Sequence, residues 1–118
     1  MGVPNSALPG VADGLLAQFT RMAVGTDATA FAVTQTALGA ETDRWTGLTT
    51  SKVTVNTTDD TARFEGTYTF PAARTGLNEF ALLDAPAGGS MLERQTYGDL
   101  NVQAGDQMYV RADVTADQ

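Results

Sequence analysis

The 118-residue sequence contains no cysteine and no histidine. Without cysteine, the chain can form no disulfide, no thiolate nucleophile, no zinc finger and no iron–sulfur cluster. Without histidine, it can form neither a Ser-His-Asp triad nor an imidazole metal site. We therefore expect a protein that is not an enzyme, with no catalytic residue, no cofactor and no bound metal.

Positive charge is also scarce, with 7 basic against 14 acidic side chains and a net charge of −7. Because nucleic-acid phosphates demand a basic surface, we expect no nucleic-acid partner. Lys52 is the single lysine, isoleucine is absent, and alanine and threonine occur 18 times each. This composition is typical of proteins from high-salt organisms, in which carboxylates stay hydrated. It is equally typical of a GC-rich genome, and the sequence leaves both explanations open.

Long apolar runs are missing as well. No segment approaches the ~20 apolar residues needed to span a bilayer, so we expect no membrane partner. Residues 1–6 lack a positive segment followed by an apolar stretch, which predicts no secretory signal. The length favours one domain. We expect residues 1–10, with Pro4, Pro9 and Gly10, to form an extended N-terminal arm and residues 11–118 to form a single domain.

The first part of the chain contains one helical pattern. Val11, Leu15, Leu16 and Phe19 share a stripe, which predicts a short helix over 12–19 docked on a sheet. Four further segments are expected before Trp45: a strand over 21–25, a loop over 26–31, a helical turn over 34–38 and a polar connection over 40–44.

From Trp45 onward the sequence consists of strand and turn patterns. The cleanest alternation sets Ala62, Phe64, Gly66, Tyr68 and Phe70 against polar neighbours, as in a half-buried antiparallel strand. It should form a hairpin with the preceding strand. The strands expected here cover 49–56, 62–70, 78–83, 91–97, 100–102 and 107–115. The fold class is therefore mainly β, an antiparallel β-sandwich or small barrel of about six or seven short strands with one short N-terminal helix.

Oxygen-bearing side chains suggest two kinds of site, each with a simpler explanation. Asn56, Asp59 and Asp60 offer calcium ligands, but too few, and such residues form turns for backbone reasons alone. A glycosidase needs two facing carboxylates. The sequence has four glutamates, for which solvated charge and cross-strand pairing are the ordinary explanation: Glu41, Glu65, Glu79 and Glu93.

Aromatic side chains suggest a sugar-binding face, which would make the chain a carbohydrate-binding adhesion module. Tyr68 lies on the apolar side of its strand and should be core, whereas Tyr109 lies on the polar side and is the better surface candidate. For Trp45 and Tyr97, the sequence does not decide between a core and a surface position. The glycine turns lack the Lys-Ser/Thr that phosphate loops require, so they predict turns only: Gly25-Thr26, Gly88-Gly89 and Gly105-Asp106.

Four motifs follow one another in a fixed order along the chain. They are Met22-Ala23-Val24-Gly25-Thr26, then Thr36-Ala37-Leu38-Gly39-Ala40-Glu41 with Arg44, then the run Glu79–Gly89 leading into Met91-Leu92-Glu93-Arg94, and finally Val102-Gln103-Ala104-Gly105-Asp106. Their order and spacing resemble, over roughly residues 12–115, a family of small virion structural proteins of tailed bacterial and archaeal viruses. The sequence departs from the family pattern at Asp27, which replaces a glycine, and at Asn78-Glu79-Phe80-Ala81, where Thr-Glu-Ala-Gly is usual.

This resemblance implies a structural role on the exterior of a virus particle made in the host cytoplasm. A capsid decoration or vertex turret protein is the first expectation, because the chain is short and has no fibrous repeat. A tail-associated or tail-fibre protein is the alternative within the same family. The implied partners are the major capsid protein or other virion proteins, together with further copies of the chain in a symmetric oligomer.

Overall fold

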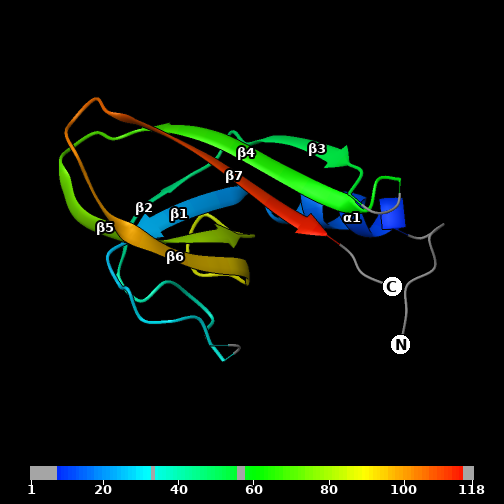
Figure 1. Ribbon diagram of the computed structural model, residues 1–118, viewed down its shortest axis with the longest axis horizontal. Helices are drawn as coiled ribbons and strands as arrows, with labels where there is room; N and C mark the ends of the chain where they lie inside the picture. The colour runs from blue at the N-terminus through cyan, green and yellow to red at the C-terminus, as the bar shows by residue number, and fades with distance from the viewer. Residues whose placement is uncertain (1–7, 33, 56–57, 116–118) are drawn as a thin grey trace.

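The computed structural model describes residues 8–32, 34–55 and 58–115, which form one helix and seven strands (Figure 1). The elements in chain order are α1 (Leu8–Gln18), β1 (Arg21–Gly25), β2 (Glu41–Trp45), β3 (Thr49–Val53), β4 (Thr61–Thr69), β5 (Arg74–Leu83), β6 (Met91–Val102) and β7 (Gln107–Thr115). The molecule measures 46 × 28 × 24 Å. The fold is mainly β, as predicted, and is a small β-sandwich.

Two antiparallel sheets face each other. One has the strand order β2-β1-β5-β6 and the other the order β3-β4-β7. Short connections join β2 to β3 and β6 to β7, so each pair of edge strands lies on one side of the sandwich. The helix α1 closes one end by packing against β3 and β4 (Figure 1). In the part of the chain that the structure describes, no helix is long and apolar enough to cross a membrane.

The strands with period-two patterns are confirmed. In β4, Ala62, Phe64 and Gly66 are buried between the sheets and Arg63 faces outward, and β4 forms the expected hairpin with β3. The last strand runs from residue 107 to residue 115, as predicted. Its apolar residues point inward because one face of each sheet must be removed from water.

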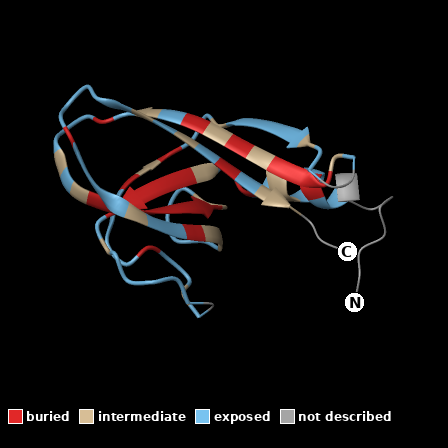
Figure 2. Cartoon of the chain, viewed as in Figure 1, coloured by how far each residue is buried: buried red, intermediate tan, exposed pale blue. Residues whose placement is uncertain are grey.

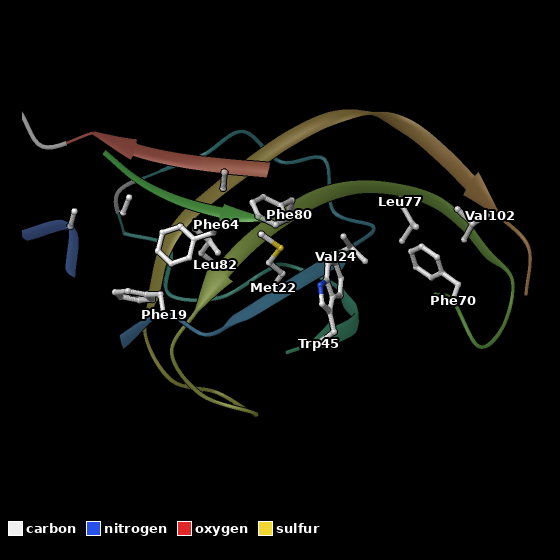
Figure 3. Close-up of a cluster of buried hydrophobic side chains, with 13 residues drawn as sticks. Phe19, Met22, Val24, Trp45, Phe64, Phe70, Leu77, Phe80, Leu82 and Val102 are labelled. Carbon is white, nitrogen blue, oxygen red and sulfur yellow. The ribbon is translucent and has the colours of Figure 1, made fainter. Parts of the chain in front are cut away.

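The main core lies between the two sheets. Figure 3 shows Met22 and Leu82 from one sheet packed near Phe64 from the other, with Phe19 below them. A second group closes the far end of the sandwich, where Phe70, Leu77 and Val102 lie together (Figure 3).

The strands β1 and β5 are buried on both faces, as Figure 2 shows by their colour. Their outward-facing residues Ala23, Ala81 and Leu83 form a separate apolar cluster with Leu38. Leu38 belongs to the connection between β1 and β2, residues 26–40, which we call the covering loop. The apolar run 78–83 predicted a central strand, and β5 is central because it pairs with β1 on one side and with β6 on the other. The covering loop buries its outer face.

The helix begins earlier than predicted, at Leu8, within the segment expected to be an extended arm. A proline at the start of a helix loses no hydrogen bond, so Pro9 fits the first turn. The remaining arm residues 1–7 lie outside the described residues. The predicted stripe is wrong at Val11, which is 38% exposed, while Ala12 beside it is buried.

Three further predictions are corrected. The expected helical turn over 34–38 is not helical and contains a single turn, in which Gln35 N donates to Ala32 O at 3.0 Å. The polar connection over 40–44 is instead strand β2. The expected break at Gly98-Asp99 does not end a strand, because β6 continues to Val102 through a shift of register.

Strand β2 was missed because its buried polar residue has partners that are distant in sequence. Asp43 is buried on β2 and accepts hydrogen bonds from the hydroxyl of Tyr68 at 2.8 Å and from Arg74 at 2.7 and 3.2 Å. Tyr68 belongs to the opposite sheet and stacks on Trp45, with ring centroids 4.6 Å apart. Asp43 therefore ties the two sheets together on the β2–β3 side.

The tie at Asp43 predicts a pH-dependent stability. Burial raises the pKa of Asp43, but hydrogen bonds from Arg74 and Tyr68 lower it by more, so the net pKa lies below its usual value. Such a group stabilises the fold above the unfolded pKa of about 3.9, and that contribution is lost as the pH falls through the folded value. In urea unfolding, we expect Asp43→Asn to lose about 1–3 kcal/mol at neutral pH and to lose less further stability on acidification than the wild type.

The matched control is Asp13→Asn, which alters an exposed carboxylate on α1 and should keep the wild-type acid dependence. If the free energy of unfolding fell equally with decreasing pH in the wild type and in Asp43→Asn, the stabilising role of the Asp43 carboxylate would be contradicted.

Candidate functional site

A fully buried ion pair lies on the outer face of the four-stranded sheet, under the covering loop. Glu79 of β5 and Arg94 of β6 have side chains that are 0% and 1% exposed. Both Nε and Nη2 of Arg94 lie 3.2 Å from Oε1 of Glu79. The two strands are neighbours, with Ala81 opposite Arg94, so the pair is diagonal across the sheet. Two charges taken out of water at this position require further hydrogen bonds.

The carboxylate of Glu79 receives those bonds from the backbone of the covering loop. Its Oε2 accepts from Asp27 N at 3.0 Å and from Ala40 N at 2.9 Å, and its Oε1 accepts from Gly39 N at 2.9 Å. These donors lie at the two ends of the loop. A single carboxylate thus holds both ends against the sheet.

The guanidinium of Arg94 binds the same loop through its carbonyl groups. Nη2 donates to Asp27 O at 2.9 Å, and Nη1 donates to Thr29 O at 2.8 Å and to Oε1 of Gln35 at 3.4 Å. Arginine suits this position because its planar group can donate in several directions at once. Together, Glu79 and Arg94 satisfy backbone groups that a loop without secondary structure leaves unpaired.

Two glycines allow the loop to approach this closely. A Cβ atom at Gly25 would collide with Oε2 of Glu79 and with the backbone of Ala40. A Cβ atom at Gly39 would collide with the carboxylate of Asp27. That carboxylate accepts hydrogen bonds from Thr29 N and Oγ1 at 2.9 and 2.7 Å, which lower the pKa of Asp27.

A second clamp connects the end of the covering loop to the turn between β5 and β6. Arg44 pairs with Glu41 at 2.7 Å. Its Nη1 also donates to Ala85 O at 2.8 Å and to Gly88 O at 3.0 Å. The turn between β5 and β6, which contains the Gly88-Gly89 motif, is thereby fixed to strand β2.

On the opposite side from Asp43, a cleft of about 230 Å³ opens between the edge strands β6 and β7. Apolar side chains of the core form part of its lining, and Tyr109, which is 59% exposed, lies at its edge. The hydroxyl of Tyr97 is buried there, with no hydrogen-bond partner among the described residues. Burial, with a smaller effect of the Glu79 charge, raises the pKa of Tyr97 to about 12. Tyr97 therefore stays a neutral donor over the physiological range.

Asp59 and Asp60, two of the calcium candidates, take part in hydrogen bonds of the connection between β3 and β4. Asp60 is buried and accepts hydrogen bonds from Val55 N at 3.0 Å and from Thr61 Oγ1 at 2.9 Å. Asp59 has a positive φ of 54° and its backbone amide donates to Thr54. Asn56 lies outside the described residues. Across 8–32, 34–55 and 58–115, no group of three or more acidic side chains is arranged to hold a metal ion.

The four glutamates have four different environments. Glu41 pairs with Arg44, Glu79 with Arg94, and Glu65 accepts a hydrogen bond from the Tyr109 hydroxyl. Glu93 accepts one from Gln95, and partial burial raises the pKa of Glu93. The expected cross-strand pairing is therefore present at Glu79, which pairs with Arg94 of the neighbouring strand, but the expectation of a solvated charge is wrong there because Glu79 is fully buried.

The aromatic side chains proposed for a sugar-binding face also differ in their exposure. Tyr68 is half-buried and packed against the core as predicted, and Trp45 is buried beside it. Tyr109 is exposed as predicted. Two of the three glycine motifs form turns as predicted, with positive φ values at Gly88, Gly89 and Gly105. The turn predicted at Gly25-Thr26 is wrong, because Gly25 is the last residue of β1 and pairs with Glu41 and Glu79.

Sequence reasoning missed the Glu79–Arg94 pair as the organising feature. A charged residue next to the apolar run Phe80–Leu83 was the available signal, because a strand covered on both faces has no solvated side for a carboxylate. Comparison of the chain with protein-family models finds no match, and comparison with curated proteins finds none either.

The buried pair predicts a large and specific loss of stability. We expect Arg94→Ala to lower the free energy of unfolding by about 3–5 kcal/mol, because it leaves the Glu79 charge buried without its partner. The measurement is urea unfolding, followed by amide hydrogen exchange at Asp27, Gly39 and Ala40. These three amides should lose protection.

The control is Lys52→Ala, which removes an exposed ion pair to Asp13 and should change stability by less than about 1 kcal/mol. Similar losses in the two variants would contradict the central role of the buried pair.

Proposed function

We propose that the chain is a non-enzymatic structural protein of a tailed virus particle, acting as a capsid decoration or vertex turret protein. It would stabilise the shell by bridging capsomers through apolar and polar contacts, as part of a symmetric oligomer with its acidic face outward. Its partners would be the major capsid protein or other virion proteins. Its place would be the particle exterior, after synthesis in the host cytoplasm.

One observation supports this proposal above the others. Five of the residues that carry the family resemblance fix the covering loop and the β5–β6 turn to the sheet or allow their close approach: Gly25, Gly39, Arg44, Glu79 and Arg94. Their side chains or backbone are used inside the chain. A pattern whose polar residues maintain a rigid scaffold suits an assembly subunit whose contacts lie elsewhere on its surface.

Mass spectrometry of separated heads and tails tests the proposal. We expect the chain in purified heads at a high and fixed ratio to the major capsid protein, which is quantified in the same sample as the reference. A chain found in tails would overturn capsid decoration and favour the tail-associated alternative. A chain missing from purified particles would overturn any virion role.

A second candidate, a carbohydrate-binding adhesion module, is favoured by Tyr109 at the edge of the β6–β7 cleft, since exposed aromatic rings stack on sugar faces. Tyr97 also lines this cleft. Trp45, which the sequence also offered for a sugar-binding face, is buried and does not support a carbohydrate-binding function.

For this candidate, we expect glycan binding by the wild type, a roughly tenfold or greater loss in Tyr109→Ala, and retention in Tyr109→Phe, which keeps the ring. A glycan array followed by titration calorimetry measures it. No binding by the wild type would exclude this function.

A further inference from the structure

The four edge strands of the sandwich are protected unequally. On one side, β2 and β3 have 5 residues each, and short edges discourage pairing with other chains. On the other side, β6 has 12 residues and β7 has 9. Register shifts interrupt β6, whereas β7 pairs with β4 without a break from Thr115 to Gln107. Within the described residues, β7 is therefore the longest regular edge, and β4 is its only paired neighbour.

The sequence of β7 is complementary to itself. It contains Val110-Arg111-Ala112-Asp113-Val114, in which opposite charges lie on either side of a central alanine. If two copies pair antiparallel with Ala112 opposite Ala112, Arg111 of one copy faces Asp113 of the other. Val110 likewise faces Val114 on the inner side of the sheet. Both kinds of cross-strand pair are favourable.

The neighbouring strand continues this charge pattern. Arg63 of β4 lies opposite Asp113 and binds it through two hydrogen bonds of 2.9 and 3.1 Å, and Glu65 lies opposite Arg111. A row across two joined sheets would then read Arg63, Asp113, Arg111 of the second copy and Glu65 of the second copy. Charge alternates at every step, and the two-fold axis repeats the row in reverse.

Within one chain, the arginine of this row is weakly engaged. Arg111 is 52% exposed, and its Nε lies 3.8 Å from Asp113, beyond hydrogen-bond distance. The β6–β7 cleft opens on the same side, with Met108 and Val110 in its lining. A second copy paired along β7 would engage Arg111 and cover apolar surface at once.

We propose that β7 is a dimer interface, at which two copies of this chain pair antiparallel about Ala112 and join their three-stranded sheets into one of six strands. The interface is isologous, since each copy presents the same strand. The inference deepens the proposed function by naming one contact of the symmetric oligomer. It is tested with purified protein in solution, so its failure is distinguishable from failure of the virion proposal.

The test is a charge-swap experiment on the full chain. Arg111→Asp places like charges opposite Asp113 of the second copy, and Asp113→Arg does the same with arginines. Each variant alone should raise the dimer dissociation constant at least about tenfold by sedimentation equilibrium. An equimolar mixture should restore dimers, because positions 111 and 113 then face each other with opposite charges across the interface in both places. Native mass spectrometry with one variant isotopically labelled identifies these as heterodimers.

Restoration on mixing separates the proposal from simple misfolding, since two damaged chains would not repair each other. The matched controls are Lys52→Asp and Asp13→Arg, which make the same changes of charge in an exposed ion pair away from β7. Both should dimerise as the wild type does. A monomeric wild type, a dimer unaffected by the β7 variants, a dimer weakened equally by the controls, or a mixture that stays monomeric would each overturn the proposal.

Discussion

Burial of the Glu79 carboxylate against Arg94 sets the condition under which the covering loop can form. Desolvating two charges costs several kcal/mol, and their mutual attraction offsets this only when the remaining lone pairs and protons are also bonded. The loop supplies three amides to Glu79 and its carbonyls to Arg94. The loop and the pair therefore stabilise each other, and neither is a reasonable structure alone.

The pair also explains how a loop without regular structure can cover an apolar surface. Ala23, Ala81 and Leu83 need a cover, which a helix or a third sheet usually provides with its backbone already hydrogen-bonded. Here the buried side chains replace that internal bonding. The requirement for close approach then restricts position 25 to glycine, because any side chain there would displace the carboxylate.

The sequence predicted what depends on local pattern and missed what depends on distant partners. The alternation around Phe64 and around Val110 identified β4 and β7, because burying one face imposes period two. Strand β2 carries no such pattern, because its buried residue Asp43 is polar. Asp43 can be buried because Tyr68 and Arg74, which are distant in sequence, donate hydrogen bonds to it. The role of Glu79 was likewise hidden, because only the fold brings both ends of the loop to it. The exposure of Tyr109 could be predicted from the sequence, because alternate residues of a strand point to opposite faces and its neighbours Met108 and Val110 are apolar.

The two sides of the sandwich consequently have different physical characters. The β2–β3 side is closed by the charged tie at Asp43 and by stacked aromatic rings, and its edges are short. The β6–β7 side has long edges, a cleft and a tyrosine hydroxyl without a partner in the described chain. Hydrogen bonds and ion pairs fix the loop and the turn on the outer face of the four-stranded sheet. The longest regular edge strand of the described residues, whose outer backbone groups can pair with another strand, lies on the β6–β7 side. This difference between the two sides is the physical basis for our proposal that two copies of the chain associate along β7.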